Sequence, residues 1–461
     1  MVKVFVLGID GAFPEFVFGK WLDELPNIKK LMDNGTYAKL NSTVPPLSVT
    51  AWNSILTGKS PVNTGLFEYV QRKNFESYDF NVITSLNLKE KQIWRVASDQ
   101  GKKSIVCYAL LTWPTKKFDG WMISDSLLGP SKDNLKSVYP PELQEELERE
   151  IGEVPPLDVA DFRNFDKQQT IDEVYKLTSK HVEAMKYLIK NKDWDFFFGL
   201  LPLSDRMNHT FWKYIDPGHR EYDPESEFKD TLKDFYKFVD GKLGELLELL
   251  DEDTKTIVLS DHGIQRMHTR INLTDWLIDN DYMVLKEPIN GKTGFNFDMV
   301  DWSKTKAFAI GAYEGQIFIN LKGKESQGIV EEEDYDSLVD ELCEKMDEIK
   351  GDDGSELKNS FFKKKNCFKG KYEKEAPDII VYFDGMQYGC NNSIVGNETQ
   401  WNPITKRGID DATHSLQGIF IMNNGYAKGY INEISYLDVA PTVLNELGID
   451  IPEDMEGEII G

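Results

Sequence analysis

The sequence has few cysteines and no paired cysteine motif. Four cysteines occur among 461 residues, and they are widely spaced without a C-x-x-C pattern: Cys107, Cys343, Cys367 and Cys390. Scattered cysteines are typical of reduced thiols in an intracellular protein rather than of a disulfide framework. The sequence also lacks an 18-residue apolar stretch, and the run Val2–Ile9 is too short for the core of a signal peptide. We therefore expect a cytoplasmic protein without a membrane span.

Positive charge is scarce relative to negative charge. The chain has 53 Lys and Arg residues against 78 Asp and Glu residues, which gives a formal net charge of −25. Nucleic-acid grooves and proteins bound to anionic membranes need clustered positive potential, so neither partner is expected. Bound divalent cations would still make a site locally positive, and a small phosphate ester therefore remains a suitable substrate.

Linkers and repeats are also missing. No Pro-, Gly- or Ser-rich spacer, internal repeat or long polar tract divides the chain. An α/β catalytic domain with insertions can contain a chain of this length. We predict one catalytic domain over residues 1–461, with a helical insertion over residues 115–190 and an α+β insertion over residues 264–410 that covers the site.

Three short apolar runs are each followed by an aspartate. Residues 4–9 precede Asp10, residues 196–201 precede Asp205 and residues 256–259 precede Asp261. Runs of this length, rich in Val, Ile and Phe, predict strands that are buried on both faces of a parallel sheet. Ligands of such sheets gather beyond the carboxyl ends of the strands. We therefore expect the three carboxylates to converge, although any one of them taken alone could simply cap a helix.

Helical periodicity separates these strands. It predicts helices over residues 16–34, 171–189, 228–250 and 331–349. His181 lies on the apolar stripe of the second helix, so we expect it to be a hydrogen-bonded core residue and not a ligand. The aromatic residues Trp52, Trp113 and Tyr69 fit either core packing or an aromatic pocket.

Three histidines accompany the aspartates. His209 is four residues after Asp205, His262 directly follows Asp261, and His414 stands between Thr413 and Ser415. Carboxylates combined with imidazoles suit Zn²⁺ or Mn²⁺, whereas Mg²⁺ and Ca²⁺ sites normally lack histidine. Two ions held roughly 4 Å apart can clamp a phosphoryl group. The sequence thus predicts a two-metal hydrolase, with zinc as the first candidate and manganese as the second.

Ser48 is the candidate nucleophile. It follows the Pro45-Pro46 loop and precedes a predicted helix that begins near Ala51, so backbone N–H groups should lie close to its hydroxyl. The sequence has no G-x-S-x-G motif, and coordination to a metal would supply the activation that serine needs at neutral pH. Thr50 remains a rival for this role.

The ordered set of motifs resembles the type I phosphodiesterase/nucleotide pyrophosphatase family of the alkaline phosphatase superfamily, almost from end to end. The matching stretches are Gly8-Ile9-Asp10-Gly11-Ala12, residues 25–31, residues 44–54 with Thr57-Gly58, residues 205–209, residues 260–263, residues 413–415, residues 438–444 and Met455-Glu456-Gly457. The resemblance implies an alkaline-phosphatase-like α/β fold, in which helices flank a mostly parallel central sheet and subdomains are inserted.

The resemblance also implies the roles of the site residues. Asp10, Asp261, His262 and Ser48 would bind one metal, and Asp205, His209 and His414 would bind the other. The family mechanism is in-line attack by the metal-activated hydroxyl, which gives a covalent intermediate that water then hydrolyses. A nucleotide or another organic phosphodiester is the substrate that it implies.

The sequence departs from the family pattern beside the nucleophile. Members typically use threonine followed three residues later by asparagine, whereas this chain has Ser48 and Ala51. Asn53 or the Ser48 backbone N–H could replace the missing donor, and we predict that Asn53 contacts the substrate. Lys59 is the only nearby cationic residue in the sequence, which favours a diester over a more highly charged monoester.

Two alternatives remain beside this reading. The first is a phosphomonoesterase or phosphomutase of the same superfamily, and the second is a non-catalytic metal-binding pseudo-enzyme. A sulfatase fits poorly, because Ser48 is not followed by the Pro and Arg of that motif.

Overall fold

The computed structural model describes residues 2–126, 137–159, 164–402, 411–423 and 428–460. Its internal contacts divide the chain into two compact units. The first unit comprises residues 1–64, 83–264 and 414–461, and the second comprises residues 65–82 and 265–413. Among the described residues, no helix combines the length and the apolar character needed to cross a lipid bilayer.

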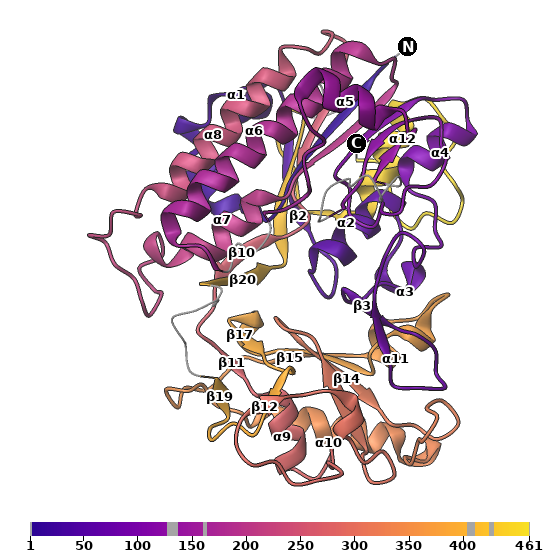
Figure 1. Ribbon diagram of the computed structural model, residues 1–461, viewed down its shortest axis with the longest axis vertical. Coiled ribbons are helices and arrows are strands. Elements are labelled where there is room, and N and C mark those ends of the chain that lie inside the picture. The colour runs from indigo at the N-terminus through magenta and orange to yellow at the C-terminus, as the bar shows by residue number, and fades with distance from the viewer. Residues whose placement is uncertain (1, 127–136, 160–163, 403–410, 424–427, 461) are drawn as a thin grey trace. The chain divides into compact units, whose positions relative to one another are not determined.

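A large mixed sheet forms the centre of the first unit (Figure 1). Its middle consists of five parallel strands, which lie side by side in this order: β9 (Lys255–Leu259), β1 (Val4–Ile9), β8 (Phe196–Leu201), β5 (Ser104–Cys107) and β6 (Gly120–Ile123). All residues of β1, β8 and β5 are buried, because helices cover both faces of the sheet. The three apolar runs are therefore strands of a mostly parallel sheet, as predicted.

Antiparallel pairs extend the sheet at both edges. Strand β7 (Val138–Tyr139) pairs with β6, and β21 (Gln417–Asn423) pairs with β9 on one side and with β2 (Gly35–Asn41) on the other. Two short strands, β22 (Gly429–Tyr430) and β23 (Ile434–Ser435), complete the edge beside β2.

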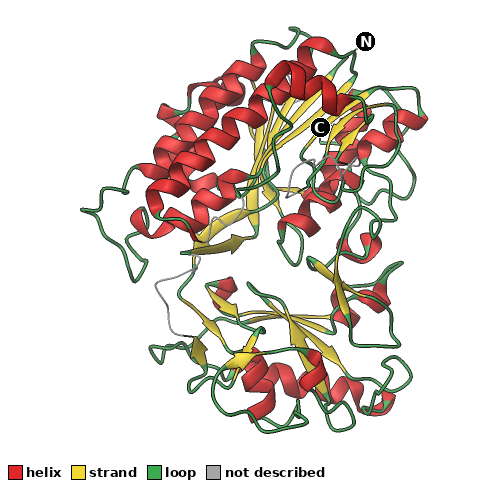
Figure 2. Ribbon diagram, in the orientation of Figure 1, coloured by secondary structure: helices red, strands yellow, loops and turns green. Residues whose placement is uncertain are grey.

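Helices flank the sheet in two layers (Figure 2). One layer contains α1 (Pro26–Asn34), α6 (Lys167–Asn191), α7 (Leu203–Phe211) and α8 (Thr231–Leu247). The other contains α2 (Ser48–Thr57), α4 (Ile93–Asp99) and α12 (Val439–Glu446). Two further helices, α3 (Pro61–Thr64) and α5 (Leu143–Ile151), complete the unit.

The predicted helix over residues 16–34 is broken into segments. A π-helical turn covers Phe16–Lys20, a 3₁₀ turn covers Leu22–Glu24, and α1 begins at Pro26. Proline lacks the N–H that a continuous helix would need, and its fixed φ suits the first position of a new helix. The helices predicted around residues 171–189 and 228–250 correspond to α6 and α8.

The second unit has its own small sheet and core. Strands β13 (Ala307–Ile310), β14 (Gly315–Ile319), β16 (Ile379–Tyr382) and β15 (Ser360–Lys363) form an antiparallel sheet in that order. The helices α9 (Leu273–Asp279) and α10 (Tyr335–Asp347) contribute apolar residues to the same core. The predicted insertions over residues 115–190 and 264–410, and the role of the latter in covering the site, stay predictions.

The segment 65–82 is tied to the rest of the second unit by polar contacts. It contains the hairpin of β3 (Val70–Arg72) and β4 (Phe80–Val82). The Arg72 guanidinium lies 2.6 Å from Glu325 and contacts the rings of Phe308 and Phe318. A buried ion pair of this kind fixes the hairpin because removal of either partner would leave an uncompensated charge.

Candidate metal centre

The carboxyl ends of three neighbouring strands bring the three aspartates together. Asp10 directly follows β1, Asp261 lies two residues beyond β9, and Asp205 lies in the first turn of α7, just after β8. The pairing of Gly8 with Leu259 and of Ile9 with Leu201 aligns these strand ends. Parallel pairing at one edge of the sheet thus converts three distant sequence positions into one cluster.

Three histidines lie at the same edge of the sheet as the aspartates. His209 lies one turn after Asp205 in α7, and His262 follows Asp261. His414 lies in β20 (Ala412–Ser415), just before β21. Because β21 runs antiparallel to β9, it begins at the edge of the sheet where β9 ends. All six residues belong to the first unit, and each residue as a whole is at most 7% exposed.

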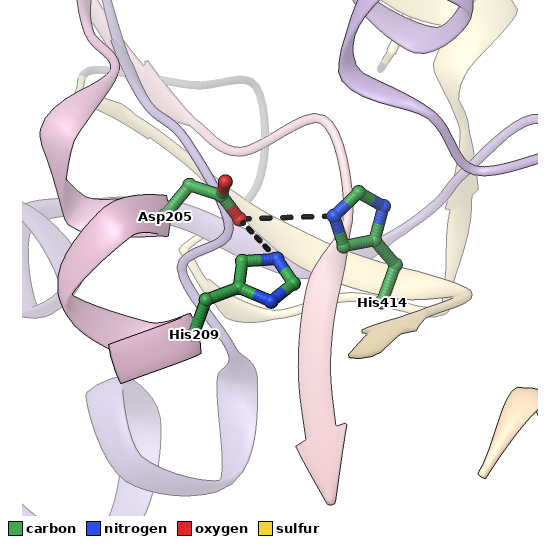
Figure 3. A group of neighbouring side chains, drawn as sticks. All are labelled: Asp205, His209 and His414. Carbon is green, nitrogen blue, oxygen red and sulfur yellow. Dashed lines mark ion pairs between the residues drawn. The ribbon is translucent and has the colours of Figure 1, made fainter. Parts of the chain in front are cut away.

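Asp205, His209 and His414 form one compact group (Figure 3). Asp205 Oδ1 lies 3.2 Å from His209 Nε2 and 3.7 Å from His414 Nε2. One ligand atom from each of the three residues lies within 4.8 Å of the others, a spacing at which a single ion could contact all three. The structure thus brings together the predicted ligand set of one metal.

Asp10, Asp205 and His262 form a second group with the same spacing. His262 Nε2 lies 3.6 Å from Asp10 Oδ1 and 3.2 Å from Asp261 Oδ2. Ser48 Oγ lies 3.1 Å from the same nitrogen, so all four ligands predicted for the other metal meet around His262 Nε2. Asp205 is common to both groups, a sharing that the sequence did not reveal.

Backbone carbonyls orient two of the imidazoles. His262 Nδ1 lies 2.9 Å from the Gly263 carbonyl oxygen, and His414 Nδ1 lies 2.7 Å from that of Pro46. A carbonyl only accepts, so each Nδ1 carries a proton, and Nε2 is the ring nitrogen that faces the carboxylates. This orientation by a second partner is typical of histidines that bind metals.

The electrostatics of the cluster also favour the binding of cations. Burial raises the pKa of Asp10 and of Asp261 well above the ordinary value, and repulsion from the other aspartates raises both further. Burial acts in the same direction on Asp205, but His209, His414 and Arg206 outweigh it and hold the pKa of Asp205 low. Burial and His262 lower the pKa of His414, while Asp205 acts in the opposite direction. Cations would relieve the repulsion among the carboxylates.

The donor set and the space around it fit divalent cations. Asp261 Oδ2 is buried and accepts no hydrogen bond from the residues that the structure describes. Gly11 has a φ of +68°, and a Cβ at this position would lie 3.2 Å from Asp205 Oδ1. Glycine therefore keeps the space in front of this oxygen open. Carboxylates mixed with neutral imidazoles are ligands for zinc or manganese.

Ser48 lies directly beside the second group. Its Oγ is 3.1 Å from His262 Nε2 and 3.3 Å from Asp10 Oδ1. Ser48 is the first residue of α2, and the N-cap residue Leu47 has no side chain that could accept a hydrogen bond. The first intrahelical hydrogen bond runs from Ala51 N to Leu47 O. The backbone N–H groups before Ala51 therefore have no partner within the helix, and no side chain caps them. Such a helix N-terminus is suited to an anion.

Thr50, Asn53 and Lys59 are placed less favourably than Ser48 for contact with a substrate. Thr50 and Asn53 are fully buried, and Asn53 Nδ2 donates to the Val49 carbonyl oxygen 2.8 Å away. The contact of Asn53 with a substrate stays a prediction. Lys59 lies beyond the far end of α2, a helix about 15 Å long, and pairs there with Glu90 and Asp454. Its charge is therefore not near the Ser48 hydroxyl.

The sequence reasoning missed two contacts to the aspartates of the cluster. Trp52 Nε1 donates to Asp10 Oδ2 over 2.9 Å, and a Cβ at Gly8 would lie 2.4 Å from the Trp52 ring. Glycine in β1 thus lets the indole pack close enough to reach Asp10. Arg206, next to Asp205 in the sequence, contacts that aspartate at 3.4 Å. Two features of the sequence could have indicated these contacts. Trp52 lies one helical turn after Ser48, and Arg206 directly follows Asp205.

The other histidine and aromatic residues have different environments. His181 is fully buried in α6, and its Nε2 lies 2.7 Å from the Pro156 carbonyl oxygen, which confirms the predicted core histidine. Trp52 is also fully buried, whereas Trp113 and Tyr69 are 36% and 46% exposed. Exposure of this size rules out core packing for the last two.

Comparison with known sequences identifies one family. The sequence profile of the type I phosphodiesterase / nucleotide pyrophosphatase family matches residues 4–400. No curated protein sequence matches the chain.

Solved structures share the fold over nearly the whole chain. Murine ectonucleotide pyrophosphatase / phosphodiesterase 5, an inactive variant in complex with AMP, is 14% identical with a TM-score of 0.58, and the match covers 99% of this chain and 98% of that one. The human protein of the same name is 13% identical with a TM-score of 0.58, over 98% and 97% of the two chains. Phosphonoacetate hydrolase from Sinorhizobium meliloti in complex with phosphonoformate is 14% identical with a TM-score of 0.62, over 97% and 96%. The predicted alkaline-phosphatase-like fold is confirmed.

Proposed function

The chain belongs to the type I phosphodiesterase/nucleotide pyrophosphatase family, and from this premise we propose that it hydrolyses phosphodiester or pyrophosphate bonds with two divalent cations and Ser48 as the nucleophile. Membership makes the chain a hydrolase, and its dependence on metal is part of the proposal. The observation that carries the finer proposal is the convergence of Ser48 Oγ, the Nε2 atoms of two histidines and three carboxylates at one edge of the sheet.

The two metal groups are assigned by proximity. His209, His414 and Asp205 would hold one ion, while Asp10, His262 and Asp261 would hold the other beside Ser48, with Asp205 close to both. The donors favour zinc, with manganese second. When bound, such ions lower the pKa of a nearby hydroxyl and compensate the charge of phosphoryl oxygens.

The residues of the chain perform the remaining steps. Ser48 Oγ, after losing its proton to solvent, attacks phosphorus, and the bond from phosphorus to the leaving oxygen breaks on the opposite side. The N–H groups at the start of α2, which has no side-chain cap, would donate to the phosphoryl oxygens. Water then attacks the phosphoserine ester, releases the phosphate product and restores the hydroxyl.

Charge matching favours a diester over a monoester. Before Ser48 loses its proton, three carboxylates and two divalent cations leave one net positive charge, which a singly charged diester neutralises. A monoester carries up to one additional negative charge and needs a further cation. Lys59 is engaged by Glu90 and Asp454. Arg206, a cationic residue that would favour the monoesterase or mutase alternative, is paired with Asp158 at 2.7 Å.

The substrate class follows from the same considerations. A small nucleotide or another organic phosphodiester fits the proposal, and the AMP bound to the murine relative and the phosphonoformate bound to phosphonoacetate hydrolase are compatible with such a molecule. The pseudo-enzyme alternative is disfavoured, because the predicted ligands and the Ser48 hydroxyl are all present in the cluster.

A cytoplasmic location is part of the proposal. All four cysteines are free, and Cys367 is exposed, which suits a reducing compartment. Fractionation of cells that express the full chain tests this, and recovery of the protein from outside the cytoplasm would contradict it.

Removal and return of metal tests the function. The protein is stripped with a chelator, reloaded with Zn²⁺ or Mn²⁺, and assayed on bis(4-nitrophenyl) phosphate. We expect turnover to vanish on stripping, to return on reloading, and to be lost in Asp10→Asn and His209→Gln. The exposed Arg149→Gln variant is the control and should behave as wild type. Turnover that survives stripping, or wild-type activity in His209→Gln, would overturn the proposal.

A further inference from the structure

Arg206 connects Asp205 to a second aspartate outside the metal groups. Its Nη1 lies 3.4 Å from Asp205 Oδ2, and its Nε and Nη2 lie 2.9 and 2.7 Å from Asp158 Oδ2. The Asp158 and Asp205 side chains are 15% and 10% exposed, and that of Arg206 is 32% exposed. The three residues form a charged row that ends at the site.

The two oxygens of Asp205 have different partners. Oδ2 faces Arg206, whereas Oδ1 faces His209 and His414. The guanidinium therefore holds the outer oxygen and leaves the inner one directed at the imidazoles. Without this contact the carboxylate could rotate about its Cβ–Cγ bond, because Oδ2 would lose its charged partner.

Asp158 fixes the guanidinium in turn. Two N–H groups of Arg206 donate to one oxygen of Asp158, which restrains a long side chain that would otherwise sample many rotamers. The planar fork of arginine can serve Asp158 and Asp205 simultaneously, and the single ammonium group of lysine cannot reproduce that geometry.

We propose that Arg206, held by Asp158, is a positioning residue that orients Asp205 and increases the affinity of the Asp205, His209 and His414 group for its cation. This inference rests on the proposed function, because it assumes that these residues bind a metal. Partners that orient a metal ligand typically contribute 10–100-fold to metal affinity.

The affinity for Zn²⁺, measured without substrate, tests the inference. Full-length wild type and Arg206→Gln are titrated with Zn²⁺ in competition with a chromogenic chelator. We expect wild type to bind two ions and Arg206→Gln to bind one of them about 10–100-fold more weakly, with the other affected much less. Arg206→Lys should fall between the two, and Asp158→Asn should weaken the same ion. Arg149→Gln, which removes a surface arginine paired with Glu150, is the matched control.

The results distinguish failure of the proposed function from failure of the positioning role of Arg206. Wild type that binds no Zn²⁺ would overturn the proposed function itself. Two ions bound with wild-type affinity by Arg206→Gln would overturn the positioning role alone. A thermal unfolding scan of the metal-free proteins shows whether the variant is folded, and if it is not, Arg206→Lys and Asp158→Asn decide: unchanged affinity in both contradicts the inference.

Discussion

The indole N–H of Trp52 donates to Asp10 Oδ2 over 2.9 Å, so that a residue one turn after the candidate nucleophile orients a candidate metal ligand on the neighbouring strand. Asp10 Oδ1 then faces Ser48 Oγ and His262 Nε2. The close approach depends on Gly8, since a Cβ at that position would lie 2.4 Å from the Trp52 ring. One hydrogen bond thus couples α2 to the end of β1 within the site.

Replacement of Trp52 by Phe should weaken the site more than the fold. Phenylalanine keeps most of the apolar contact but removes the donor, so Asp10 is free to rotate. We expect a reduction of kcat/KM on a diester, and of affinity for one Zn²⁺ ion, of about tenfold or more, with a loss of about 1–3 kcal/mol in the free energy of unfolding. Steady-state kinetics, metal titration and denaturant unfolding measure these effects. Unchanged kinetics and affinity would contradict the role assigned to the indole.

A methyl group at Gly11 should block the space in front of Asp205. In Gly11→Ala the Cβ would lie 3.2 Å from Asp205 Oδ1 and 3.0 Å from Asn208 Nδ2, at a φ of +68°. We expect loss of one bound metal and of diesterase activity, together with about 1–2 kcal/mol of backbone strain. Metal content measured by mass spectrometry after dialysis reports the loss.

Gly101 provides the matched control for this variant. Its φ is +76°, but no atom lies within 4 Å of the Cβ position. Gly101→Ala should therefore show similar strain while retaining both metals and full activity. Equal metal content in the two variants would show that Gly11 does not protect the site.

Ser48 and Thr50 differ in their access to the cluster. Ser48 Oγ contacts His262 and Asp10, whereas Thr50 is fully buried within α2. We expect Ser48→Ala to lose at least about a thousandfold in kcat, comparable to the loss of other catalytic groups, and Thr50→Ala to retain turnover. Mass spectrometry of acid-quenched enzyme should find a phosphoryl adduct on Ser48. Turnover lost only in Thr50→Ala would reverse the assignment.

Two glutamates, the buried Glu314 and the partly exposed Glu68, should make the second unit less stable at high pH. Burial and repulsion from Glu68 raise the pKa of Glu314 to about 8, and burial raises that of Glu68 to about 7. The pKa of glutamate in the unfolded chain is near 4.5. Between pH 4.5 and about 8 the folded state therefore binds more protons than the unfolded state. The stability from the protonated carboxyls is fully present below pH 4.5 and is lost as the pH rises through 7 and 8.

Glu314→Gln should remove most of this dependence. The variant should unfold at a higher temperature than wild type at pH 9, with the advantage shrinking toward pH 5. Each unit of pKa shift corresponds to about 1.4 kcal/mol, and the exposed Glu332→Gln serves as the control. Parallel pH profiles for the wild type and Glu314→Gln would contradict the account.

Much of the site could be predicted because its physical causes are local in sequence. Runs such as residues 196–201 are apolar throughout, since the strand is buried on both faces, and their aspartates follow at the carboxyl ends. Position along the chain was therefore sufficient to place Asp10, Asp205 and Asp261 at one edge. The break before α1 was also visible in principle, because Pro26 suits only the start of a helix.

The remaining features depend on contacts between distant segments. The bond from Trp52 to Asp10 requires the packing of α2 on β1, and the contact of Arg206 with Asp158 joins α7 to a loop about 50 residues earlier. The engagement of Lys59 by Asp454 likewise connects residues far apart in the sequence. No pattern within a sequence window encodes such pairs.

The central claim, a metal-dependent hydrolase that prefers diesters, is tested most directly by one ratio. The Zn²⁺- or Mn²⁺-loaded protein is assayed on bis(4-nitrophenyl) phosphate and on 4-nitrophenyl phosphate, and the two kcat/KM values are compared. We predict that the diester value exceeds the monoester value by at least about tenfold, or about 1.4 kcal/mol in transition-state stabilisation. A preference for the monoester, or no turnover of either ester by protein that contains both metals, would contradict the account.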